Sequence, residues 1–126
     1  MGRVMHFEIQ AEEPERAIQF YTDVFGWKIT QWGEDEYWLI TTGPKEEPGI
    51  DGGITKRRGA LDDNAVLAYV CTITTTNVDD AIAKVKAHGG ENVVPRMPIP
   101  TVGWLAYCKD TEGNIFGVMH ADPNAK

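Results

Sequence analysis

The chain has 126 residues, 42% of them apolar and 25% charged, which is the size and composition of one ordinary globular domain. Twelve basic side chains oppose nineteen acidic ones, and the resulting net charge of −7 argues against nucleic acid and acidic membrane surfaces as partners. No apolar run approaches the roughly 18 residues of a membrane helix, and the first residues do not resemble an export signal. We therefore expect a cytoplasmic protein.

The first predicted element is a strand over residues 4–10, where apolar and polar side chains alternate. Because successive side chains of a strand point to opposite faces, Phe7 and Ile9 share one face, and His6 and Glu8 share the other. The strand is expected to bury the first pair and to leave the second pair on a partly polar surface.

A helix is predicted over residues 14–25, since apolar side chains recur there at helical spacing and Gly26 provides a stop signal. Aromatic and β-branched residues in 27–32 and 37–42 predict two strands joined by a short turn. A Gly-rich strand is predicted at 52–56. The first half of the chain therefore has the order βαβββ.

The second half repeats this order after a linker-like stretch at residues 57–64. Asn77 is the predicted N-cap of the second helix, and Gly89 and Gly90 end it. The other predicted elements are strands at 66–74, 91–96, 104–109 and 115–120, with a Pro-rich loop at 97–103.

A few identical residues recur in the two halves at one shift, and together with the repeated order of elements they indicate an internal duplication. A shift of 64 positions pairs identical residues, among them Ile9 with Ile73 and Gly53 with Gly117. We predict one α+β domain of two βαβββ modules, the first over about residues 3–58 and the second over about 65–121. Eight strands would curl around a shared cavity, with both helices outside.

Two segments resemble the vicinal oxygen chelate superfamily, the group of glyoxalases, bleomycin resistance proteins and extradiol dioxygenases. One is residues 14–21 with the aliphatic, aromatic and glycine ending at 24–27, and the other is the acidic, Gly-containing turn and strand at 109–117. With the paired βαβββ order, the resemblance covers nearly the whole chain.

In metal-dependent members, the resemblance implies a divalent ion held by the first and last strands of each module. His6 matches the first of these positions and is a good ligand for Zn, Ni, Fe or Mn. The second falls on Val70, or on Tyr69 if one residue is inserted, and the last-strand positions fall on Gly53 and Gly117. The match therefore predicts that the usual metal site is largely missing, and that no cofactor is required.

Three interpretations of His6 and Glu8 stay open at this point. The two side chains could simply hydrogen-bond to each other or to water on a half-solvated strand face. They could hold a divalent ion weakly, although a catalytic zinc normally keeps three protein ligands. Either one could also act as a general base without a metal. We name His6 and Glu8 as candidate catalytic residues, and His6 as the one candidate metal ligand.

A ligand pocket is predicted around Trp104, together with Thr72 and Met119. Trp104 directly follows the Pro-rich loop at 97–103, where a mobile lid would be placed. Core packing is the alternative explanation for a tryptophan in this position.

The resemblance implies a glyoxalase-like or bleomycin-resistance-like protein that binds or processes a small organic ligand. A metal-dependent lyase or dioxygenase with His6 as its surviving ligand is one alternative, and a non-catalytic binding protein is another. Exposed strand edges and aromatic surface lead us to expect a homodimer.

Overall fold

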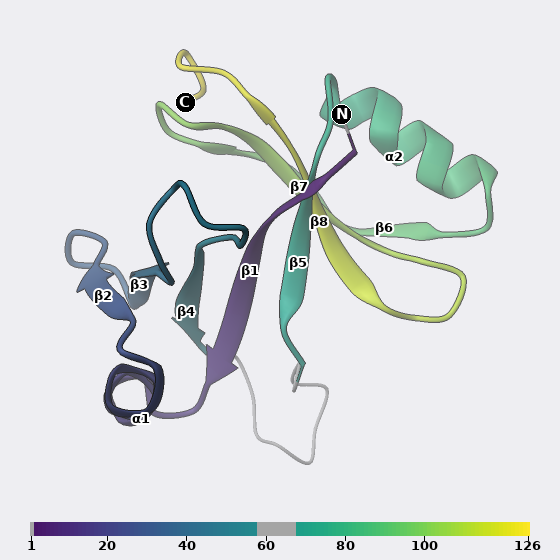
Figure 1. The fold of residues 1–126 in the computed structure, drawn as a ribbon. Coiled ribbons are helices and arrows are strands. Elements are labelled where there is room, and N and C mark those ends of the chain that lie inside the picture. Colours follow the sequence, from purple (N-terminus) through teal and green to yellow (C-terminus); the bar gives the residue numbers. More distant parts are fainter. Residues whose placement is uncertain (1, 58–67) are drawn as a thin grey trace. The chain divides into compact units, whose positions relative to one another are not determined.

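A computed structural model describes residues 2–57 and 68–126, and its elements follow the order βαβββ twice (Figure 1). The α+β class and the tandem modules are thereby confirmed. The described residues form two compact units, the first made of residues 6–57 with 68–69 and the second of residues 2–5 with 70–126. The elements are β1 (Val4–Ala11), α1 (Pro14–Phe25), β2 (Lys28–Gln31), β3 (Tyr37–Thr41), β4 (Gly52–Lys56), β5 (Val70–Thr74), α2 (Val78–Ala87), β6 (Glu91–Ile99), β7 (Gly103–Lys109) and β8 (Ile115–Ala121).

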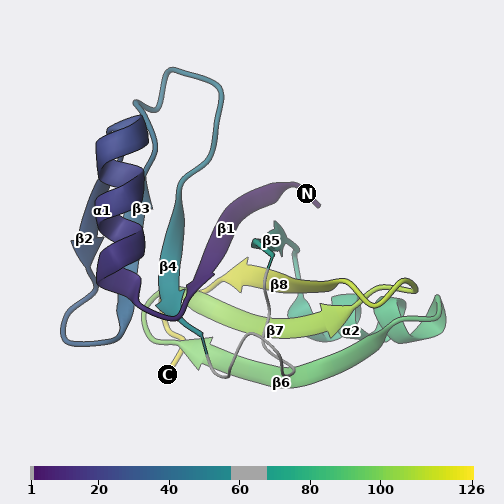
Figure 2. The same cartoon turned by 90° about the horizontal axis from the view of Figure 1, so that it is seen from below.

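The first unit is a four-stranded sheet in the order β2-β3-β4-β1, with α1 packed on one face (Figures 1 and 2). Strand β1 runs parallel to β4, and the other neighbours are antiparallel. The alternation of β1 buries Phe7, Ile9 and Ala11 against α1, as its pattern predicts, and Ile54 on β4 is fully buried in the same core. Burial of this core fixes which side chains are left on the face away from α1.

The second unit repeats the arrangement, with strand order β5-β8-β7-β6 and α2 on one face. Its core is built from Val78 of α2 with Ala106, Cys108 and Val118 of the sheet. The chain's own beginning completes this unit, because the backbone N–H of Gly2 donates to Thr74 O at 3.0 Å.

The registers of the two sheets confirm the duplication at a shift of 64 residues. Glu8 pairs with Gly53 between the parallel strands β1 and β4, and Thr72 pairs with Gly117 between β5 and β8. Both members of the second pair lie 64 residues after those of the first, as do the first residues of the two helices. The residue equivalent to His6 is therefore Val70 and not Tyr69.

Helix limits agree with the predicted capping residues. Gly26 ends α1 with a φ of 72°, the left-handed conformation that a side chain disfavours. The Asn77 side chain accepts a hydrogen bond from Asp80 N at 3.0 Å at the start of α2. Neither described helix is long and apolar enough to cross a membrane.

The prediction of a Pro-rich loop at 97–103 was wrong in its first half. Strand β6 continues to Ile99 and carries Pro95 and Pro98, with register shifts along its pairing with β7. Proline is tolerated there because β6 lies at an edge of the sheet, where a missing N–H breaks no second ladder. The predicted linker at 57–64 and the first part of the predicted strand at 66–74 lie largely outside the described residues. The shared cavity stays a prediction.

Candidate functional site

The site of most chemical interest lies on the face of the first sheet that points away from α1. We call this surface the polar face; alternation along the strands and the registers of β1, β3 and β4 place on it His6, Glu8, Gln10, Tyr37, Gly53 and Thr55. Leu39 of β3 lies on this face as well, whereas Phe7, Ile9, Ile40 and Ile54 of the same strands are buried in the core on the side of α1. Packing of the core therefore orients the polar residues.

His6 is bound to Tyr37 across the sheet. Its Nε2 atom and the Tyr37 hydroxyl lie 2.8 Å apart, a short and partly buried hydrogen bond between side chains 31 residues apart in sequence. A neutral imidazole can accept the phenolic proton at Nε2 or donate its own, depending on its tautomer. In either tautomer, the Nε2 atom of His6 is engaged.

The charge state of His6 is set mainly by burial. Burial lowers the pKa of His6 below its ordinary value of 6.5, and the nearby carboxylates of Glu8 and Asp51 raise it by less. The imidazole is therefore neutral near pH 7. Asp51 is itself held in place, because its Oδ1 accepts a hydrogen bond from Thr42 N at 2.9 Å.

Gly53 leaves space for this hydrogen bond. A Cβ atom built at position 53 would overlap the hydroxyl oxygen of Tyr37 and would lie 2.7 Å from its Cε1 atom. Gly53 is buried beside Glu8, so the phenol occupies volume that a side chain at 53 would need.

The donor atoms at the four positions that the resemblance implies for a metal are few. His6 carries an imidazole, but Val70 is a buried aliphatic residue, and Gly53 and Gly117 have no side chains. Within the part of the chain that is described, no group of three or more His, Cys, Asp or Glu side chains could hold a metal ion. Glu8 adds one carboxylate beside His6 on this face.

The predicted pocket residues of the second unit lie on different faces of its sheet. Thr72 and Met119 lie on the face away from α2, together with Gly117 and Tyr107. Trp104 packs instead with the core under α2. The three predicted pocket residues therefore do not line one surface.

Trp104 is also engaged by polar neighbours. Its indole Nε1 donates to Asp122 Oδ2 at 2.9 Å, and the Arg96 guanidinium lies 4.5 Å from the centre of its ring. Arg96 in turn pairs with Asp79 in the first turn of α2 at 3.1 Å. These contacts tie β6 and β7 to the start of α2.

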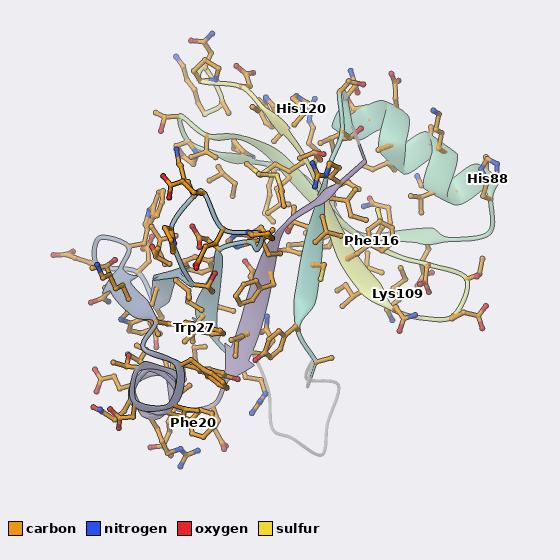
Figure 3. All side chains as sticks on the ribbon, in the orientation of Figure 1. Phe20, Trp27, His88, Lys109, Phe116 and His120 are labelled. Carbon is orange, nitrogen blue, oxygen red and sulfur yellow. The ribbon has the colours of Figure 1, made fainter. Side chains whose placement is uncertain are left out.

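Another histidine supports the second unit. His120 on β8 accepts at Nδ1 from the backbone N–H of Val78 at 2.9 Å, and so satisfies a donor at the beginning of α2. Figure 3 shows it at one end of that helix, with His88 at the other. The imidazole of His120 therefore has a structural partner.

Similarity to known proteins extends over most of the chain. A family model described as the glyoxalase/bleomycin resistance protein/dioxygenase superfamily matches residues 3–118. The chain belongs to this superfamily. A glyoxylase-like domain-containing protein from Didymella fabae is 27% identical over 124 residues, which cover 93% of this chain and 92% of that protein.

Solved structures share the fold at low sequence identity. A superfamily member from Vibrio splendidus 12B01 has a TM-score of 0.65 at 13% identity, over 95% of this chain and 99% of that one. Methylmalonyl-CoA epimerase from Mycobacterium tuberculosis has a TM-score of 0.65 at 15% identity, over 97% and 89% respectively. At these identities the likeness establishes the fold alone.

Sequence reasoning named His6 and Glu8 but missed Tyr37 and Asp51. A signal for Tyr37 was present, since a glycine inside a strand leaves room for a large side chain on a neighbouring strand. The identity of that neighbour depends on strand pairing, which the sequence pattern alone does not fix.

Proposed function

We propose that this superfamily member binds a small organic ligand on the polar face of its first unit, with His6 and Tyr37 as the groups that recognise it. The observation that carries the proposal is the 2.8 Å hydrogen bond between His6 Nε2 and the Tyr37 hydroxyl. A related structure, a methylmalonyl-CoA epimerase, is described in complex with methylmalonyl-CoA, so the fold is compatible with an organic ligand.

The charges on this face indicate the class of ligand. A neutral imidazole and a phenol can exchange hydrogen bonds with a hydroxyl or carbonyl oxygen. Glu8 and Asp51 place negative charge near His6, and the whole chain carries a net charge of −7. The ligand group that meets His6 is therefore uncharged, because a carboxylate or phosphate would be repelled.

The same residues allow a proton transfer. A general base must be unprotonated at the working pH, and burial keeps His6 in that form near pH 7. The Tyr37 hydroxyl can relay the proton if its oxygen accepts the Nε2 proton while its own proton passes to the ligand or to solvent. A ligand with an acidic proton within reach of His6 would be a substrate and not only a bound molecule.

Binding can be tested by nuclear magnetic resonance of the histidine side chains. A panel of small hydroxyl and carbonyl compounds would be added to the ¹⁵N-labelled protein, alongside carboxylates of matched size. We expect the uncharged compounds to shift the His6 imidazole signals, and His6→Ala to abolish the binding. His88→Ala is the matched control, because His88 follows the last residue of α2 in the other unit and its Nδ1 atom bonds to Lys84 O of the same helix.

Two results would contradict the proposal. One is binding that His6→Ala and Tyr37→Phe both leave unchanged. The other is isomerisation of the hemithioacetal of methylglyoxal and glutathione at a substantial rate after nickel or zinc is added, because that result would favour the metal-dependent lyase.

A further inference from the structure

The phenol of Tyr37 fills the space beside Gly53 and bears on whether His6 can bind a metal ion. A side chain at position 53 and the phenol of Tyr37 exclude each other, since a Cβ there would overlap the hydroxyl oxygen. The two residues lie on neighbouring strands, β4 and β3, whose register sets Tyr37 beside Thr55 and Leu39 beside Gly53. The pairing of β3 with β4 therefore determines that a side chain at position 53 and the Tyr37 phenol would overlap.

Position 53 is also where a third metal ligand would complete a site. Glu8 pairs directly with Gly53, and His6 precedes Glu8 by two residues on the same face of β1. A carboxylate at 53 would stand beside one carboxylate and one imidazole, which makes the three protein ligands typical of a catalytic zinc. Gly53 supplies no donor at this position, and the Nε2 atom of His6 is bonded to Tyr37.

We infer that the Tyr37 hydroxyl, for which Gly53 leaves space, bonds to His6 in the place of a metal ion. The polar face then recognises its ligand through hydrogen bonds from an imidazole and a phenol, and not through coordination to a metal. This inference rests on the site of the proposed function, but it concerns metal ions and holds whichever organic ligand binds.

A packing role for Tyr37 is the competing explanation, because aromatic rings often cover a glycine on the neighbouring strand. The Tyr37→Phe variant separates the two explanations. The ring stays over Gly53 while the hydroxyl is lost, so packing alone would leave the ¹⁵N signal of His6 Nε2 unchanged. Our inference expects that signal to shift as the hydrogen bond is removed, and an unchanged signal would overturn it.

The decisive experiment adds the missing ligand and removes the phenol together. The double variant Tyr37→Ala/Gly53→Glu would be titrated calorimetrically with zinc, nickel and manganese chlorides, beside the parent chain. We expect the double variant to gain a site for one ion, and the parent to show none. Adding His6→Ala to the double variant should remove the new site, whereas His88→Ala should not.

Two outcomes would overturn the inference. A stoichiometric site in the parent that His6→Ala abolishes would show that Tyr37 does not exclude a metal. A double variant that keeps the circular dichroism spectrum of the parent but gains no site would show that Gly53 and Tyr37 are not the cause of exclusion.

A second measurement covers the case in which the double variant does not fold. Manganese ions added to the labelled parent broaden the signals of nuclei close to any bound ion. We expect no selective broadening at His6, and selective broadening there would overturn the inference. Because neither test uses an organic ligand, failure of the proposed function would leave its result unaffected.

Discussion

The substitution Gly53→Ala should change the stability of the protein in a direction that depends on Tyr37. In the parent, the new methyl group would overlap the Tyr37 hydroxyl, so the ring must move and its bond to His6 is lost. With Tyr37→Ala already present, the three atoms that the methyl group would meet first are removed. One substitution is therefore expected to have opposite effects in the two backgrounds.

The size of the effect follows from three contributions. Overpacking in a close-packed interior costs about 1–3 kcal/mol, and the lost hydrogen bond costs about 1 kcal/mol. Alanine in place of glycine in a strand recovers about 0.5–1 kcal/mol of backbone entropy. We expect Gly53→Ala to lower the free energy of unfolding of the parent by about 2 kcal/mol, and to raise that of Tyr37→Ala by about 0.5 kcal/mol.

Urea denaturation followed by tryptophan fluorescence would measure all four members of this double-mutant cycle. Gly43→Ala is the control, since its Cβ would meet only the end of the Glu47 side chain, at 3.1 Å, and should change stability by less than about 0.5 kcal/mol. Equal effects of Gly53→Ala in both backgrounds would refute the reasoning, because the coupling between Tyr37 and Gly53 would then be zero.

Four further outcomes are expected. Burial lowers the pKa of His6 in the folded chain, so the unfolded chain binds more protons just below pH 6.5, and stability should fall as the pH drops from that value toward the folded pKa. Urea midpoints across this range should show the fall in the parent and a weaker one in His6→Ala. Ile54→Ala should cost about 2–5 kcal/mol by the same assay because Ile54 is fully buried, and a cost below 1 kcal/mol would contradict the described core. His120→Ala removes the acceptor of Val78 N–H and should cost about 0.5–2 kcal/mol, with faster amide exchange at the start of α2. Light scattering should give twice the 14.0 kDa mass of one chain if the predicted homodimer forms, and a monomer mass at tens of micromolar would contradict it.

Alternation and helix-capping residues predicted most of the fold, because each of these signals depends only on a few neighbouring residues in the sequence. The alternation of β1 placed Phe7 and Ile9 in the core, and the capping residues Gly26 and Asn77 stand at the ends that the structure gives to their helices. The 64-residue repeat predicted from the sequence is also present in the strand registers, where Gly53 and Gly117 occupy equivalent pairs.

Signals that depend on the neighbouring strand were harder to interpret. Pro98 suggests a loop when only the sequence is considered, but it is compatible with β6 because that strand has a partner on one side only among the described strands. Trp104 was expected in a ligand pocket, although Ala106 and Cys108 share its face of β7 and both lie in the core under α2. Alternation along β7 would have indicated this placement.

The candidate site was predicted in part. His6 could be named from its strand and from a resemblance, since both are features of a short segment. Its bond to Tyr37 joins residues that are 31 positions apart, and it exists only when β1, β3 and β4 pair in one register. No local pattern contains that information.

The hydrogen bonds of residues 2–5 have a consequence for the order in which the protein can fold. Gly2 N donates to Thr74 O, and Thr74 N donates to Arg3 O, each at 3.0 Å. During synthesis, residues 2–5 leave the ribosome long before Thr74 is made. This end of β1 therefore pairs with Thr74 only later, whereas the rest of the strand can already pair with β4. Closing such a long loop is slow, which makes this pairing a late step on the folding pathway. A bulky tag fused directly before residues 2–5 should therefore impair the assembly of residues 70–126 more than that of the unit that begins at His6.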